Sequence, residues 1–167
     1  MKVSVFGLGY VGAVSTACLA RDGRTVIGVD VNPEKVRIVG SGKAPIMELG
    51  LTELLAAGVH SGLISATTDC EQAIRDTDVS LITVGTPNKP NGELDLSAVT
   101  GVCEEIGLAV QRKKSMHSVI IRSTVPAGTM RACRRILEEH AGDTPIHVAC
   151  NPEFLREGSA IRDYDSP

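Results

Sequence analysis

Three glycines and one acid near the start of the chain have the types and spacing of a dinucleotide-binding site. Gly7, Gly9 and Gly12 form a G-x-G-x-x-G sequence after one apolar run, and Asp30 closes the next apolar run. In such a motif the first glycine allows a tight turn, the second lets the backbone approach a pyrophosphate, and the third lets a helix pack closely on a sheet. Asp30 stands close to the offset of roughly 20 residues at which an acid binds the adenosine ribose. The spacing therefore predicts that a dinucleotide binds here.

Three further residues belong to the same predicted site. Tyr10 and Val11 lie inside the glycine motif, where the free N–H groups of the following helix would face the phosphates. Lys35 falls one turn into a short helix that we expect to begin at Pro33, with Asn32 as its cap. From its position Lys35 could reach the ribose end of a cofactor or could be a solvated surface lysine, and both interpretations stay open.

Polar residues also follow the later apolar runs. Thr86 and Thr124 could hydrogen-bond a ribose, a nicotinamide or a water, or could simply cap the next helix. Glu153 and Glu157 are four apart, so they would share one face if that stretch were helical. Two carboxylates beside a cofactor could divide acid and base work through shifted pKa values. The alternative is a solvated face in which both pair with neighbouring arginines.

The five cysteines indicate neither a disulfide framework nor a zinc site, because they are widely spaced and no C-x-x-C occurs. We therefore predict no metal site. Cys150 lies beside the last polar stretch, but the one histidine near it, His147, belongs to the same predicted strand, which makes Cys150 a poor candidate nucleophile. Free cysteines in apolar surroundings suit a reducing, cytoplasmic setting.

Composition excludes several classes of function. The chain has 167 residues, 43% apolar and 22% charged, with a net charge of −3, as in an ordinary globular domain. No apolar run approaches the roughly 20 residues that cross a bilayer. There is no basic cluster, and two tyrosines and two phenylalanines make no base-stacking platform. We expect neither a membrane nor a nucleic acid as partner.

The elements that must position these residues alternate along the chain. We expect strands over 2–6, 25–29, 63–67, 78–84, 118–122 and 146–149, and helices over 13–20, 33–39, 51–57, 69–75, 95–112 and 128–139. The stretch 58–62 is interpreted as a connection. This order predicts an α/β fold with a doubly wound, Rossmann-type, mostly parallel sheet and helices on both faces. Because the carboxyl ends of parallel strands share one edge, where ligands bind, the candidate residues should converge there.

Four stretches, in this order, resemble the motifs of the UDP-glucose/GDP-mannose 6-dehydrogenase family, and the resemblance covers essentially the whole chain. The most specific is the last, and the 45–51 loop (PIMELGL) adds to it, although the family more often has proline at Leu49. Within the family, 88–96 and 159–164 look closer to the GDP-mannose enzymes than to the UDP-glucose enzymes. The four stretches are FGLGYVG (6–12), VGTP (84–87), RSTV (122–125) and NPEFLREG (151–158).

The resemblance implies NAD as cofactor and a nucleotide-sugar substrate. The primary alcohol of the sugar would be oxidised in two steps, four electrons in all, to a carboxylate. The conversion of GDP-mannose to GDP-mannuronate is the first expectation and UDP-glucose oxidation the alternative. The glycine loop, including Tyr10 and Val11, would hold the pyrophosphate, and Asp30 and Lys35 would attend the adenosine ribose. Thr86 and Thr124 would line the cofactor, and Thr124 would also help to place a catalytic water.

The resemblance also implies roles for residues of the last motif, 151–158. Glu153 would be an acid/base group at the sugar, Glu157 would lie between cofactor and substrate, and Phe154, Leu155 and Arg156 would contact the substrate. The family's nucleophilic cysteine, with its assisting lysine and asparagine, belongs to a later segment that nothing here matches. We therefore expect 1–167 to be the N-terminal NAD-binding domain of a longer, homo-oligomeric enzyme, without its linker helix and nucleotide-sugar domain.

Such a domain should bind NAD without turnover, because the nucleophile is missing. Two other hypotheses use the same fold. A hydroxyacid-type dehydrogenase would need a catalytic lysine later in its chain, and it gives no reason for the 151–158 stretch. A non-catalytic NAD-binding module would need no further domain at all.

Overall fold

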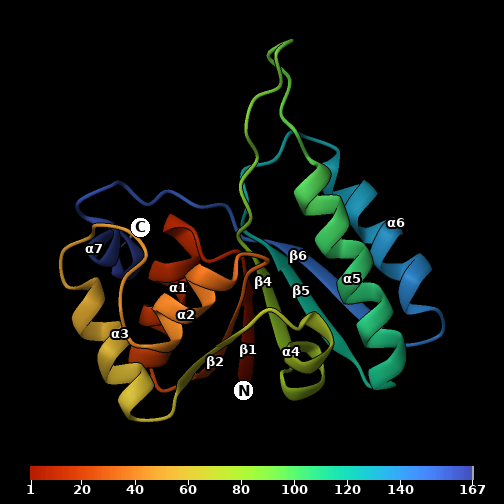
Figure 1. Ribbon diagram of the computed structural model, residues 1–167. Coiled ribbons are helices and arrows are strands. Elements are labelled where there is room, and N and C mark those ends of the chain that lie inside the picture. Colours follow the sequence, from red (N-terminus) through yellow and green to blue (C-terminus); the bar gives the residue numbers. More distant parts are fainter. Residues whose placement is uncertain (167) are drawn as a thin grey trace.

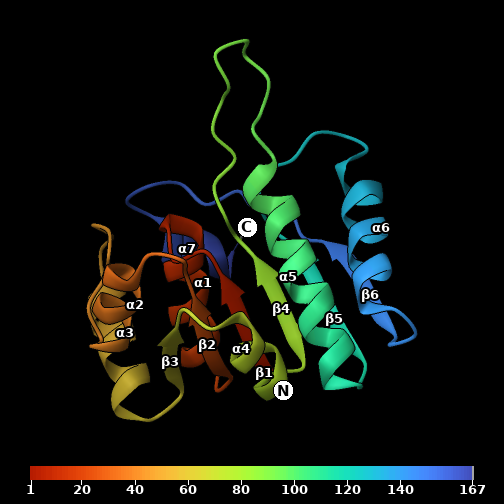
Figure 2. The same ribbon diagram turned by 45° about the vertical axis from the view of Figure 1, so that its right-hand side comes forward.

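A six-stranded sheet forms the centre of the computed structural model, which describes residues 1–166 (Figures 1 and 2). The strand order is β3-β2-β1-β4-β5-β6, and each of the five pairings between neighbours is parallel. This is a doubly wound sheet, in which the direction of winding reverses between β1 and β4. The strands are β1 (Lys2–Phe6), β2 (Thr25–Val29), β3 (Ile64–Thr67), β4 (Val79–Ile82), β5 (His117–Ile121) and β6 (Ile146–Cys150).

Helices cover both faces of the sheet, and each face has its own apolar core (Figure 1). On one face lie α1 (Tyr10–Arg21), α2 (Pro33–Gly40), α3 (Leu51–His60) and α7 (Ala160–Asp165). On the other lie α4 (Cys70–Asp76), α5 (Ser97–Lys113) and α6 (Thr129–Ala141). The expected fold class, a Rossmann-type α/β sheet, is confirmed.

Alternation along β1 explains how the strand serves two cores. Val3 and Val5 are buried against α1, whereas Phe6 is buried on the side of α5. Side chains of a strand point alternately to opposite faces, so a central strand covered on both faces must be almost wholly apolar. The strand's first residue, Lys2, is exposed, and its one buried polar residue is Ser4.

Ser4 belongs to a buried polar chain at the end of the sheet remote from the predicted site. Its hydroxyl lies 2.8 Å from that of Ser80 and 3.1 Å from that of Thr77. Ser80 Oγ in turn lies 2.7 Å from Nε2 of His117, and the Lys113 ammonium lies 3.3 Å from the other ring nitrogen. Each of these three buried hydroxyls thus has a partner, which removes the free-energy cost of burying it alone.

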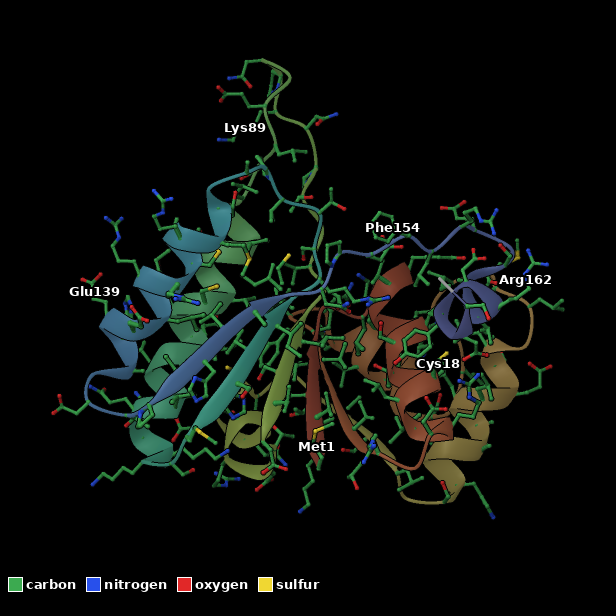
Figure 3. The ribbon with its side chains drawn as sticks, turned by 180° about the vertical axis from the view of Figure 1, so that it is seen from behind. Met1, Cys18, Lys89, Glu139, Phe154 and Arg162 are labelled. Carbon is green, nitrogen blue, oxygen red and sulfur yellow. The ribbon has the colours of Figure 1, made fainter. Side chains whose placement is uncertain are left out.

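The connection between β4 and α5 projects beyond the carboxyl edge of the sheet, as both views show (Figures 1 and 2). An antiparallel bridge between Asn88 and Leu94 joins its two arms. Lys89 lies near its tip (Figure 3). Among residues 1–166 no helix combines the length and the apolar character that a membrane crossing requires.

Several element boundaries differ from those expected. The first helix begins at Tyr10, inside the glycine motif, and β4 ends at Ile82. The expectation of a connection from Gly58 is wrong, because α3 continues to His60. Helix α7 was not expected at all. Pro167 lies outside the described residues.

Candidate functional site

The glycine loop has the geometry that its spacing predicts. Gly7 has φ +96°, which favours glycine, and a Cβ there would lie 2.9 Å from the backbone of Val84. A Cβ on Gly12 would lie 1.8 Å from the carbonyl oxygen of Gly7, so the helix can approach the strand only without one. Gly9 instead faces open space, because a Cβ on this residue would meet nothing within 4 Å. Gly7 and Gly12 therefore serve the fold, and Gly9 leaves room for a ligand.

Helix α1 starts directly after that open space. Tyr10 is its first residue, and no acidic side chain stands in its first turn. The free N–H groups and the positive end of the helix dipole therefore face the edge of the sheet without an acidic side chain from their own turn. Tyr10 and Val11 lie where the motif predicts phosphate binding.

Asp30 follows β2 and is almost completely buried, with 8% of its surface exposed. Its Oδ2 accepts a hydrogen bond from the Leu8 N–H at 2.7 Å, and its Oδ1 accepts one from the Asn32 N–H at 2.9 Å. The Lys35 ammonium lies 3.7 Å from Oδ2. Asp30 thus links the glycine loop to the end of β2, and Lys35 reaches the same carboxylate. Carboxylate oxygens have further lone pairs for ribose hydroxyls.

A cavity of about 240 Å³ opens beside Asp30. Gly7 and Asp30 line one side of it. The other side is one face of α5, on which Ala98, Gly101 and Glu105 follow at helical spacing. A Cβ on Gly101 would meet nothing within 4 Å, so this face leaves space for a flat group next to the carboxylate.

A second cavity, of about 260 Å³, lies on the other side of the glycine loop. It brings together residues that are far apart in the sequence: Tyr10, Val11, Thr86, Thr124 and Glu153 all line it. The Thr86 hydroxyl donates to the carbonyl of Thr124 at 2.9 Å, which ties the ends of β4 and β5 together.

Neither of the two threonines caps a helix. Helix α5 begins at Ser97 and α6 at Thr129, several residues after Thr86 and Thr124 respectively. The residue before α6 is Gly128, and near α5 it is Asp95 whose carboxylate accepts from the Ser97 N–H at 3.0 Å. The capping interpretation of Thr86 and Thr124 is therefore wrong.

The last motif does not form the helix on which Glu153 and Glu157 would have shared a face. Residues 151–156 run irregularly along the edge of the sheet. Glu153 accepts a hydrogen bond from the Leu155 N–H and lines the second cavity. Glu157 is exposed on the turn before α7. The two carboxylates therefore have different surroundings.

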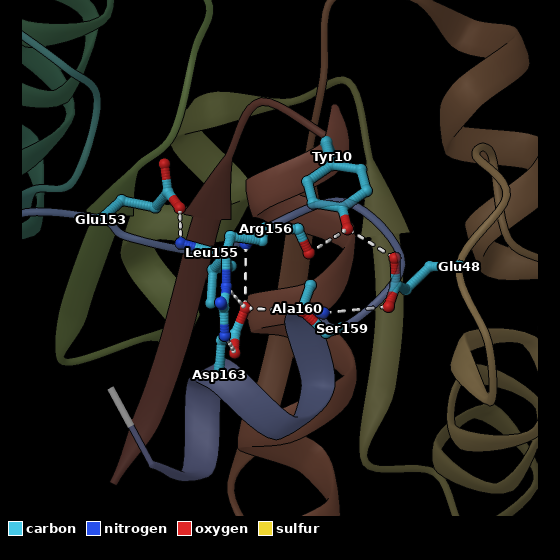
Figure 4. A network of polar contacts seen from close by, with 8 residues as sticks. All are labelled: Tyr10, Glu48, Glu153, Leu155, Arg156, Ser159, Ala160 and Asp163. Atoms are coloured by element: carbon cyan, nitrogen blue, oxygen red, sulfur yellow. Dashed lines mark hydrogen bonds and ion pairs between the residues drawn. The ribbon is translucent and has the colours of Figure 1, made fainter.

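The three residues expected to contact substrate have different environments. Phe154 is 75% exposed (Figure 3), whereas Leu155 packs on the apolar core beneath α1. The guanidinium of Arg156 is bound by Asp163, with Nη2 2.7 Å from Oδ1 and Nε 3.0 Å from Oδ2 (Figure 4). These hydrogen bonds hold the pKa of Asp163 far below its usual value. One edge of the Arg156 guanidinium is therefore occupied by Asp163 of α7.

Arg122, at the end of β5, was not singled out by the sequence. It lines the second cavity and also a third, of about 300 Å³, which Phe154 and Tyr164 line as well. Its guanidinium carbon lies 5.8 Å from the centre of the Tyr164 ring, within cation–π range. Its Nη1 donates to the amide oxygen of Asn151. Asp163 and Glu48 were also not singled out. The partners of Glu48 are distant in sequence, whereas Asp163 binds Arg156 only seven positions away.

The five cysteines lie in different surroundings. Cys150 is exposed at the end of β6, and His147 is three positions earlier on the same strand. Odd spacing on a strand turns two side chains to opposite faces. Cys18, Cys103 and Cys133 are buried, and burial raises the pKa of the Cys18 thiol to about 11. Among the described residues, no group of three or more His, Cys, Asp or Glu side chains is arranged to hold a metal ion.

The chain is similar to known proteins over its whole length. The model of the UDP-glucose/GDP-mannose dehydrogenase family, NAD binding domain, matches residues 1–167. GDP-mannose 6-dehydrogenase of Pseudomonas aeruginosa is 48% identical over 171 residues, which cover 100% of this chain and 39% of that protein. UDP-glucose 6-dehydrogenase of Rhizobium meliloti is 40% identical over 168 residues, covering 100% and 38%.

Solved structures agree with the sequence relatives. The ternary complex of GDP-mannose dehydrogenase from Pseudomonas aeruginosa superposes with a TM-score of 0.98 at 48% identity, covering 100% of this chain and 39% of that one. A UDP-glucose dehydrogenase from Pyrobaculum islandicum superposes with a TM-score of 0.96 at 42% identity, covering 99% and 39%. The chain thus spans about two fifths of the relatives that it matches. It belongs to the UDP-glucose/GDP-mannose dehydrogenase family, as that family's NAD-binding domain.

Proposed function

We propose that this chain is the cofactor-binding part of a nucleotide-sugar 6-dehydrogenase. GDP-mannose is the preferred candidate for its substrate, and UDP-glucose is the alternative. One observation carries the proposal. Two cavities flank the glycine loop at the carboxyl edge of the sheet, one beside Asp30 and one lined by Thr86, Thr124 and Glu153. Their positions suit the two ends of one extended dinucleotide.

The adenosine end of NAD would occupy the cavity beside Asp30. The carboxylate would accept hydrogen bonds from the ribose hydroxyls, and the adenine would lie against Ala98 and Gly101 of α5. The pyrophosphate would cross Gly9 and meet the N–H groups of Tyr10 and Val11, where no Cβ intervenes. Lys35 would partly offset the negative charge at the ribose.

The nicotinamide end would occupy the second cavity. When bound there, NAD supplies a hydride acceptor for oxidation of the sugar's primary alcohol. Thr86 and Thr124 would fix the ring, and Thr124 would help to hold a water. Glu153 would take or return a proton at the sugar, because its carboxylate faces the same cavity. Glu157, with Phe154, Leu155 and Arg156, would border the substrate.

Further parts of the proposal concern the whole protein. The complete enzyme would be longer than this chain and homo-oligomeric, and the nucleophilic cysteine would lie in the later part. The buried, free thiols of Cys18, Cys103 and Cys133 support a reducing compartment such as the cytoplasm. The relatives named GDP-mannose 6-dehydrogenase are the basis for the first choice of substrate.

A chimera tests the proposal. Residues 1–167 would replace the matching segment of the Pseudomonas aeruginosa GDP-mannose 6-dehydrogenase, and NADH formation would be followed with GDP-mannose. We expect the chimera to form two NADH per GDP-mannose consumed and the isolated chain to form none. The chimera carrying Asp30→Ala is the control, and it should need a higher concentration of NAD to form NADH at the same rate. A folded chimera that binds NAD without oxidising the sugar would contradict the proposal.

A further inference from the structure

We propose that Glu48 is a positioning residue that joins the NAD-binding loop to the turn carrying Glu157, so that cofactor binding orders this turn. Glu48 belongs to the loop before α3 and is not part of either cavity beside the glycine loop. The inference rests on the proposed NAD site. It concerns how that site is linked to the last motif of the chain.

Three donors converge on the carboxylate of Glu48, and Figure 4 shows two of them, Tyr10 and Ala160. The Tyr10 hydroxyl donates to Oε2 at 2.5 Å, and the Gly158 N–H donates to the same oxygen at 2.8 Å. The Ala160 N–H donates to Oε1 at 3.0 Å. The Tyr10 hydroxyl also lies 3.2 Å from the carbonyl of Arg156. The Glu48 side chain therefore joins the start of α1 to Gly158 and Ala160 of the turn.

The chemistry of these contacts requires an ionised carboxylate. An ionised carboxylate only accepts hydrogen bonds and offers two oxygens, whereas an amide would present two N–H donors in place of one of them. Burial would raise the pKa of Glu48, but the hydrogen bonds from Tyr10, Gly158 and Ala160 outweigh it and lower the pKa. Desolvation, together with the same carboxylate, raises the pKa of the Tyr10 hydroxyl, so the hydroxyl keeps its proton to donate.

A second carboxylate holds the turn from the opposite side. Asp163 Oδ2 accepts from the Arg156 N–H at 3.1 Å and from the Ser159 hydroxyl at 2.9 Å. The segment from Arg156 to Ala160 is thus fixed between two acids (Figure 4). Of these two acids, only Glu48 also contacts the start of α1, so Asp163 provides an internal comparison: it orders the turn without contacting the cofactor loop.

Tyr10 is the residue through which the two regions are coupled. Its backbone N–H is at the start of α1, where the pyrophosphate would lie, and its side chain holds Glu48. A ligand that immobilises the backbone of Tyr10 also restricts its hydroxyl. The hydroxyl then restricts the Glu48 carboxylate, and the carboxylate restricts the turn that it holds. The reverse must hold to the same extent, because coupling between two sites is reciprocal. Glu157, between Arg156 and Gly158, would be positioned when NAD is bound.

Amide hydrogen exchange of this chain, with and without NAD, tests the inference. The variants are Glu48→Gln and Tyr10→Phe, and the matched control is Glu53→Gln, an equal charge change at an exposed position of α3. Without NAD, Glu48→Gln should exchange about tenfold faster at Gly158 and Ala160, because each loses a bond to a charged acceptor. The amide of Arg156, which Asp163 holds, should change much less, and Glu53→Gln should match the unmodified chain.

Addition of NAD separates positioning from simple stabilisation. In the unmodified chain and in Glu53→Gln, NAD should slow exchange at Gly158 and Ala160. In Glu48→Gln and Tyr10→Phe this slowing should be lost, although the amides of residues 8–12 are still protected. An equal effect of NAD on the turn in all four proteins would overturn the inference and leave the NAD site intact. Failure of the unmodified chain to bind NAD would overturn the proposed function, and the coupling with it.

Discussion

The N–H of Leu8 donates to the carboxylate of Asp30 at 2.7 Å, so the acid at the end of β2 holds the glycine loop as well as the predicted ribose site. The position of Asp30 in the motif explains its role at the ribose but not its contact with the glycine loop. The contact also explains how an acid can be almost completely buried: it accepts from two backbone N–H groups and lies near an ammonium. Buried carboxylates without such partners are strongly unfavourable.

Asp30→Ala should weaken NAD binding by about tenfold or more, because a hydrogen bond to a charged group contributes roughly 1.5–3 kcal/mol. It should also lower the free energy of unfolding, because the N–H groups of Leu8 and Asn32 lose their acceptor. Calorimetric titration and urea denaturation measure the two effects. Asp143→Ala, at an exposed position, is the control. Unchanged unfolding in Asp30→Ala would show that the carboxylate does not hold the loop.

The chain should prefer NAD to NADP, because the 2′-phosphate of NADP would lie against the carboxylate of Asp30. Two nearby cations could soften this repulsion. Arg37, however, is paired with Glu34 at 2.6 Å, and Lys35 lies 3.7 Å from Asp30 itself. We expect at least tenfold discrimination, and we expect Glu34→Gln to reduce it by freeing Arg37. Titration of both cofactors checks this, and equal affinities for the unmodified chain would refute it.

His117 should make the protein less stable in mild acid. Burial, followed by the neighbouring Lys113 ammonium, lowers the pKa of His117 to about 4 in the folded chain. The unfolded chain takes up this proton near pH 6.5, so the unfolded state gains protons first as pH falls. Stability is therefore lost between pH 6.5 and about pH 4, by about 3 kcal/mol at 1.36 kcal/mol per unit.

Urea denaturation across this pH range measures the loss. Between pH 6.5 and 5, where few carboxylates titrate, the free energy of unfolding should depend less on pH in His117→Gln than in the unmodified chain. His60→Gln, at an exposed position, should keep the pH dependence of the unmodified chain. The same pH dependence in both variants would rule out His117 as the source of the loss of stability. The polar groups around this ring are Ser80, Lys113, Asp78 and the backbone of Thr77.

Gly12→Ala should destabilise the fold itself. The added Cβ would lie 1.8 Å from the Gly7 carbonyl oxygen and 2.7 Å from the Thr83 hydroxyl, and the first of these is backbone that cannot move aside. Overpacking of this kind costs roughly 1–3 kcal/mol or more. Thermal unfolding measures the change, with Gly85→Ala as control, because a Cβ on Gly85 meets nothing within 4 Å. Equal melting temperatures for Gly12→Ala and the unmodified chain would contradict the packing role.

The strands and most helices could be predicted because their apolar residues follow local periods and their caps are local. Asn32 and Asp69 accept hydrogen bonds from N–H groups two and three residues later, as expected for caps. Gly58 shows where local reasoning failed. It suggested a turn, yet it lies inside α3, where a Cβ would be 2.3 Å from the Ile64 side chain. Packing against the sheet, not turn formation, explains this glycine.

The edge of the site could be predicted, but the contacts that fix its last motif could not. The fingerprint glycines and Asp30 are close in sequence, and parallel topology brings Thr86, Thr124 and Glu153 to the same edge. Glu48, by contrast, is 110 positions from Gly158, and no local pattern connects them. Helix α7 was missed for a similar reason, since contacts such as that of Arg21 with Asp165, at 2.6 Å, hold it from across the chain.

Calorimetric titration of NAD into the unmodified chain and into Gly9→Ala is the sharpest test of whether the pyrophosphate of NAD lies across Gly9. Gly9 has φ −81° and open space around its Cα, so alanine there should leave the fold and its melting temperature unchanged. The new methyl group would fill the space that the pyrophosphate is proposed to occupy. We predict saturable binding of one NAD to the unmodified chain and affinity at least tenfold lower in a normally folded Gly9→Ala. Equal NAD affinity in the two proteins would show that the cofactor does not lie across Gly9.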